Sequence, residues 1–121
     1  MCKYWADGFQ IPLLRQYPTV MRHFMKDCPT IENLKSELTT LLKNEIPNRI
    51  ELIKFIEKIQ TGDWESKAYI HFVKPENPNQ LNSEWQFQEN LILESKIYGT
   101  LILDILTENR IGGIEFLNRV K

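Results

Sequence analysis

The sequence predicts an α+β fold in which N-terminal helices pack on one face of a C-terminal antiparallel sheet. Apolar residues recur with a helical period of about 3.6 as far as Gly62, and after Trp64 the period changes to about 2. The strand-like segments follow one another without intervening helices, which excludes the alternation typical of a parallel sheet. The chain has 121 residues, a usual size for one domain, so we expect residues 1–121 to form a single domain.

About three helices are expected in the first half of the chain. The first covers 18–28, and the second starts after Thr30, a good N-cap residue. Asn48 and Glu51 have the spacing of a capping box for the third helix, which Gly62 is expected to end. The three predicted apolar faces are Val20, Met21, Phe24, Met25 and Cys28; Ile31, Leu34, Leu38, Leu41 and Leu42; and Ile50, Ile53, Ile56 and Ile59 with Leu52 and Phe55.

Four segments are predicted as strands, so the sheet should have at least four: 67–73, 84–94, 98–107 and 110–117. In the second of them Trp85, Phe87, Leu91 and Leu93 are expected on one face. The first two segments are separated by KPENPNQLNS, in which the prolines and asparagines predict a loop.

The register of the last two strands follows from burying one apolar face. A two-residue loop at Glu108 and Asn109 is expected, because asparagine tolerates a positive φ. A loop longer by one residue would place Leu103 opposite Glu115, which a buried face would not accept. The predicted apolar pairs, which should face the third helix, are Leu101 with Phe116, Leu103 with Ile114, and Ile105 with Gly112.

Two acids, Asp104 and Glu115, share the opposite face in this register. Asp104 lies opposite Gly113, and Glu115 lies opposite Ile102, so the two carboxylates are one diagonal step apart, about 7–8 Å. Gly113 is expected to leave Asp104 uncovered, and Gly112 to make room for a helix on the other face. The sequence thus predicts that the two acids face outward from the helices.

The acid pair could be read as a general acid/base couple. A solvated outer face is the commoner reason for such a pair, and no nucleophile, metal-ligand set or phosphate loop accompanies it. His23 and His71 lack a second ligand at metal-binding spacing, and Gly112 and Gly113 lack the lysine of a phosphate loop. We therefore expect no catalytic residues, no cofactor and no metal site.

Two further residues stand out. Glu89 falls on an otherwise apolar strand face, and a β-bulge near Glu89 and Asn90 would turn it outward. Trp64 lies between Asp63 and Glu65 at the junction of helix and strand, where it could anchor a partner, although a core position is the default expectation for a tryptophan.

The bulk properties exclude several classes of protein. Fifteen basic and sixteen acidic residues give a net charge of −1, which argues against a general nucleic-acid binder. The start, MCKYWADGFQIP, does not have the pattern of a signal peptide, and no apolar run is long enough to span a membrane. Cys2 and Cys28 are expected to be free thiols of a cytoplasmic protein, with a disulfide as the alternative.

The C-terminal segments resemble those of a known family. WQFQENLILE (85–94) and GTLILDILTENRIGGIEFL (99–117) are similar to the last strands of small immunity proteins from bacterial polymorphic-toxin systems, including contact-dependent growth inhibition. The resemblance rests on the patterns W-x-F-x-E-N, G-T-x-x-L-D and R-x-G-G-I-E-F. The helical half, residues 12–62, contributes nothing to it.

The resemblance implies a cytoplasmic protein that is not an enzyme. Such a protein, an antitoxin in effect, binds and neutralises the C-terminal toxin domain of a delivered effector, often a nuclease. We place the partner on the face with Asp104 and Glu115, with Glu89 at its margin and Trp64 as an aromatic anchor, and take a monomer as the default. The alternatives are a small hydrolase that uses Asp104 and Glu115, and an accessory subunit with a large exposed apolar patch.

Overall fold

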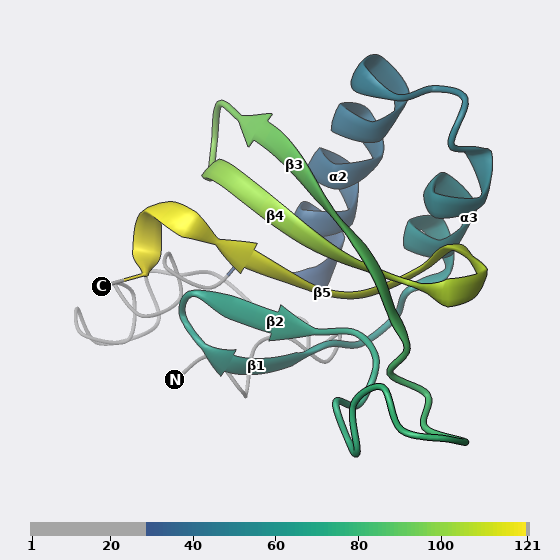
Figure 1. The fold of residues 1–121 in the computed structure, drawn as a ribbon. Helices are drawn as coiled ribbons and strands as arrows, with labels where there is room; N and C mark the ends of the chain where they lie inside the picture. The colour runs from purple at the N-terminus through teal and green to yellow at the C-terminus, as the bar shows by residue number, and fades with distance from the viewer. Residues whose placement is uncertain (1–28, 121) are drawn as a thin grey trace.

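The computed structural model describes residues 29–120, which fold as two α-helices on one face of a five-stranded antiparallel sheet (Figure 1). The α+β class and the expected sheet of four or more strands are confirmed. The helix expected over 18–28, like Cys2 and Cys28, lies outside the described residues. The elements are α2 (Ile31–Glu45), α3 (Ile50–Lys58), β1 (Asp63–Ser66), β2 (Tyr69–His71), β3 (Phe87–Ser95), β4 (Gly99–Leu106), β5 (Arg110–Phe116) and two 3-10 turns, η3 (Thr107–Asn109) and η4 (Leu117–Arg119).

The two helices start differently. Thr30 caps α2 as predicted, because its hydroxyl accepts the backbone N–H of Asn33 at 3.1 Å. α3 starts after Arg49 without a side-chain cap, so the capping box predicted for Asn48 and Glu51 is wrong. α3 also ends before Gly62, at Lys58. The buried residues of the two helices are Ile31, Leu34, Leu38 and Leu42 of α2, and Leu52, Ile53 and Ile56 of α3.

The sheet has the strand order β1-β2-β5-β4-β3, with every neighbouring pair antiparallel. α2 lies against β3 and α3 lies against β5, so both helices cover the same face (Figure 1). β1 was not predicted: of its four residues Asp63–Ser66 only Trp64 is buried, which is too little pattern to recognise. A tight turn at Lys67 and Ala68 joins it to β2, with the Ser66 hydroxyl accepting the Ala68 N–H at 3.1 Å.

The predicted register of β4 and β5 is confirmed for its central pairs, Leu101 with Phe116 and Leu103 with Ile114. All four side chains are completely buried, in one core cluster with residues of both helices. The loop prediction is wrong in its length: η3 is a three-residue turn in which Glu108 and Asn109 have φ of 65° and 56°.

A bulge in β5 compensates for the longer turn. Asp104 pairs with Gly113, but Ile105 pairs with Ile111 and not with Gly112 as predicted. Gly112 is therefore the extra residue, and it returns the strand to the register that buries Leu103 and Ile114.

β3 contains a second bulge, between Phe87 and Glu89. Phe87 lies opposite Leu106 and is 43% exposed, whereas Leu91 and Leu93 lie opposite Leu103 and Leu101 of the core. The expectation of one face formed by Trp85, Phe87, Leu91 and Leu93 is therefore wrong, because the extra residue moves the start of the strand to the opposite face.

Candidate functional site

The face of the sheet that the helices leave open carries a group of polar and acidic side chains. Tyr69 pairs with Glu115, and both His71 and Asp104 pair with Gly113, so these residues share that face. Glu65 of β1 reaches the same group through His71. We call Glu65, Tyr69, His71, Asp104 and Glu115 the acidic face. It combines side chains from β1, β2, β4 and β5.

The centre of the acidic face is a bond that crosses a strand. The Tyr69 hydroxyl of β2 donates a hydrogen bond to Asp104 Oδ2 of β4, although β5 lies between the two strands. Gly113 of β5 makes this crossing possible. A Cβ atom at Gly113 would lie 2.5 Å from the Tyr69 hydroxyl and 2.6 Å from the Ile70 carbonyl oxygen. Gly113 thus does not leave Asp104 uncovered, as the sequence suggested, because Tyr69 covers it.

Three carboxylates act on Tyr69 together. Burial raises the pKa of the phenol well above its ordinary value of 10.0, and the hydrogen bond to Asp104 raises that pKa further. The negative charges of Asp104, Glu65 and Glu115 add to the same shift. Tyr69 therefore remains a neutral donor over the physiological pH range, and the site has a locally negative potential.

His71 joins the acidic face to Trp85. Its Nε2 lies 3.0 Å from Glu65 Oε1, and its ring lies 4.5 Å from the Tyr69 ring and 5.9 Å from the Trp85 ring. Trp85 lies over Gly112, where a Cβ would come within 2.6 Å of the indole. Gly112 thus makes room for a tryptophan on the outer face, and not for a helix as expected. His71 Nδ1 is buried without a hydrogen-bond partner.

Asp104 and Glu115 do lie on the predicted face, and each has different surroundings. Asp104 is already engaged by Tyr69. A cavity of about 380 Å³ beside Glu115 is lined by Glu65, Tyr69 and Arg119 among others, and Asp104 is not among its lining residues. The cavity therefore brings Glu115 and Glu65 together, and not Glu115 and Asp104.

The other two predicted site residues lie elsewhere. Glu89 lies opposite Ile105, on the helix-covered face and not turned outward by the bulge, and its carboxylate is 3.5 Å from the guanidinium of Arg49 at the start of α3. Trp64 is fully buried and packs against Phe116 with ring centroids 5.4 Å apart. A partner could not reach Trp64 in this fold, so its expected role as an anchor is wrong and the core position is confirmed.

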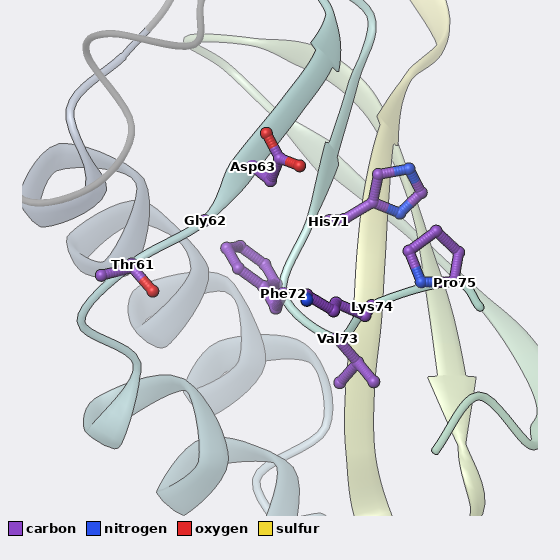
Figure 2. Close-up of a pocket in the computed structure, with 8 residues that line it drawn as sticks. All are labelled: Thr61, Gly62, Asp63, His71, Phe72, Val73, Lys74 and Pro75. Atoms are coloured by element: carbon purple, nitrogen blue, oxygen red, sulfur yellow. The ribbon is translucent and has the colours of Figure 1, made fainter. Parts of the chain in front are cut away.

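A second cavity, of about 440 Å³, lies where α3 leads into β1 and β2 leaves the sheet. Thr61, Asp63, Phe72 and Lys74 are among the residues around it (Figure 2). His71 lines this cavity too, and Figure 2 shows the Phe72 and His71 side chains projecting to opposite sides of the chain, so His71 connects the cavity with the acidic face. The cavity does not bring Asp104 or Glu115 to its wall.

Tyr69, Glu65 and Trp85 are the site residues that the sequence did not single out. Their signal was the Gly112-Gly113 pair, which marks places where other side chains approach the backbone closely.

Within residues 29–120, no cluster of three or more histidine, cysteine or acidic side chains could hold a metal ion. In the same range no helix is long and apolar enough to cross a membrane. Comparison with protein-family models, curated proteins and solved structures finds no match for this chain.

Proposed function

We propose that this protein is a small cytoplasmic immunity protein of a bacterial toxin system, a binding protein rather than an enzyme. It binds and neutralises the C-terminal toxin domain of a delivered effector, such as a nuclease. The proposal combines the resemblance of residues 85–117 to such immunity proteins with one structural observation. Carboxylates from three strands, Glu65, Asp104 and Glu115, converge around Tyr69 on the open face of the sheet.

The electrostatics of this face support a basic partner. Neither Asp104 nor Glu115 is in an ion pair with a basic side chain among residues 29–120, and Glu65 pairs with His71 alone. Nucleases present basic surfaces to the phosphates that they cleave. A rigid acidic surface would attract such a basic cleft at long range and favour one partner over others. Because the net charge of the chain is only −1, the attraction comes from this local group and not from the protein as a whole.

The test uses the domain encoded immediately upstream of this chain's gene, with which an immunity protein would form a complex. We expect the double change Asp104→Asn with Glu115→Gln to lower its association rate constant by about tenfold at low salt and to flatten the salt dependence of binding. The asparagine side chain introduced by Asp104→Asn keeps an acceptor for the Tyr69 hydroxyl, so the fold should survive. Stopped-flow association at several salt concentrations measures the effect.

Glu51→Gln with Glu57→Gln is the matched control. Both glutamates are exposed on α3, with side chains 64% and 50% accessible, and their replacement changes the net charge by the same amount. If both double variants slow association equally, net charge and not the acidic face attracts the partner. If the wild-type protein does not bind the upstream domain at all, the proposed function is wrong.

A further inference from the structure

The segment 72–86 between β2 and β3 has no helix or strand, and it extends away from the body of the domain (Figure 1, teal to green at the lower right). Loops of this length inside a small domain are uncommon and are usually either disordered or functional. We call this segment the β2–β3 loop. Of its residues only Trp85 is buried, so most of the loop lies outside the core and its structure needs another explanation.

Hydrogen bonds within the β2–β3 loop fix its path. Asn79 is at the centre: its backbone N–H donates to the Trp85 carbonyl at 2.7 Å, and its side-chain Oδ1 accepts the Phe87 N–H at 2.8 Å. The Ser83 hydroxyl donates to the Glu76 carbonyl at 2.6 Å. The Gln86 amide donates to the carbonyls of Gln80 and Ser83, at 2.6 and 3.0 Å. These bonds indicate an ordered loop closed on itself, of the Ω type.

The backbone of the same loop adopts a conformation that most residues avoid. Asn77, Asn79 and Asn82 have φ of 48°, 64° and 69°. Asparagine is the residue other than glycine that best tolerates this left-handed region. Three such positions so close together persist only where the surrounding structure holds them, and they are commonest at functional sites.

The base of the loop is attached to the acidic face. Trp85 is only 8% exposed and contacts the His71 ring and Gly112, as described above. Arg110 of β5 donates from Nη2 to the Glu84 carbonyl at 2.7 Å. A protein that covers the acidic face is therefore next to the base of the β2–β3 loop.

The β2–β3 loop holds the side chain of Leu81 in solvent. It is 92% exposed, more than any other large apolar side chain described, and the next most exposed is Ile97 at 70%. A leucine in that position contributes almost nothing to folding, since little of its surface is removed from water. An apolar side chain on a preformed loop binds a partner with little loss of conformational entropy.

We propose that the β2–β3 loop is a preformed contact element that inserts Leu81 into an apolar pocket of the protein bound by the acidic face. The inference rests on the proposed function and adds a second recognition element to it. The partner surface would then combine a basic region, opposite Glu65 and Glu115, with an apolar pocket beside it. The acidic face would govern how fast the two proteins meet, and Leu81 would govern how long they stay together.

The test compares Leu81→Ala with Ile97→Ala, using the domain encoded immediately upstream as the probe. Ile97 is the matched control, because it is also exposed and apolar but lies in the β3–β4 turn, at the other end of β3. We expect Leu81→Ala to raise the dissociation rate constant by about tenfold or more and to leave the association rate constant nearly unchanged. Ile97→Ala should change neither, and both variants should keep the melting temperature of the wild type.

The outcomes separate this inference from the proposed function. If the wild type binds the probe and Leu81→Ala dissociates at the wild-type rate, the loop inference is wrong and the proposed function stands. Equal increases in the dissociation rate constant for Leu81→Ala and Ile97→Ala would also overturn the inference. The loss of any exposed apolar side chain would then weaken binding, whatever its position. A wild type that does not bind the probe overturns the proposed function and this inference with it.

A measurement on the free protein tests the preformed state of the loop. The heteronuclear NOE of the backbone amides of 77–83 should equal that of the sheet, and Asn79→Ala, which removes the acceptor for the Phe87 N–H, should lower it. Low values in the wild type would show that the loop is not preformed and would refute the inference even if Leu81 contacts a partner.

Discussion

The two faces of the sheet are built in different ways. The helix-covered face is built mainly from aliphatic and aromatic side chains, such as Leu103 and Ile114, that are buried in one cluster. The open face depends on two close approaches, Tyr69 over Gly113 and Trp85 over Gly112. Any large apolar residue of similar volume could serve on the first face, whereas the second needs particular residues at particular positions. The open face thus depends on specific pairs of residues, and the helix-covered face depends on apolar volume.

The largest effect is expected from the helix-covered face. Leu103→Ala should lower the free energy of unfolding by about 2–5 kcal/mol, since it removes a buried side chain and leaves a cavity in the core. Ile92→Ala is the control on the open face, where Ile92 is 64% exposed and lies on the neighbouring strand. It should change the stability by less than about 0.5 kcal/mol. Urea denaturation measures both, and similar losses would mean that the open face is buried by something else.

A glycine on the open face should give the next largest effect. Gly113→Ala should cost about 1–3 kcal/mol, because the new methyl group meets both the Tyr69 ring and the Ile70 carbonyl. In a Tyr69→Ala background the same change should cost less, although the carbonyl contact remains. The two changes should therefore be non-additive in a double-mutant cycle of unfolding free energies. Additive losses would show that Tyr69 does not cross β5 at Gly113 in solution.

The hydrogen bond alone should give the smallest effect. Tyr69→Phe should cost about 1 kcal/mol at neutral pH, because Asp104 is half-buried and water can replace part of the lost bond. The loss should depend on pH. The pKa of Tyr69 is raised in the folded state, so its contribution is complete below its unfolded pKa of about 10 and declines as the pH rises above that value.

Urea denaturation of the wild type and of Tyr69→Phe, from about pH 8 to about pH 11, measures the difference in stability between the two proteins. This range extends from below to above the ordinary tyrosine pKa of about 10. The difference should narrow at alkaline pH, because only the wild type has the Tyr69 hydroxyl to ionise. A difference that stays constant or widens would contradict the raised pKa. Effects of lysines and of Tyr98 are common to both proteins and cancel in the comparison.

The sequence by itself determined the elements that repeat a burial pattern. The faces of α2 and the outward position of Asp104 and Glu115 follow from the requirement to bury one apolar face. The loop between β2 and β3 follows from the prolines and asparagines of KPENPNQLNS. The core pairs were predicted correctly although the predicted loop between β4 and β5 was one residue too short, because the bulge at Gly112 restores the register that the core needs. The burial of Leu103 opposite Ile114 was therefore predictable even though the turn was not.

Only the tertiary structure decided which side chains meet across the open face. β2 and β5 are neighbours in the sheet but distant in the chain, and no sequence period specifies their pairing. That pairing brings Tyr69 to Gly113 and Asp104, while the pairing of β1 with β2 places the buried Trp64 opposite Ile70. The bulge at β3 likewise moved Phe87 outward and kept Glu89 beside Arg49. The need to bury apolar side chains determines which face of each helix or strand points inward, and that face can be read from the sequence of the element itself. Contacts between strands that are distant in the chain depend on how the whole chain folds.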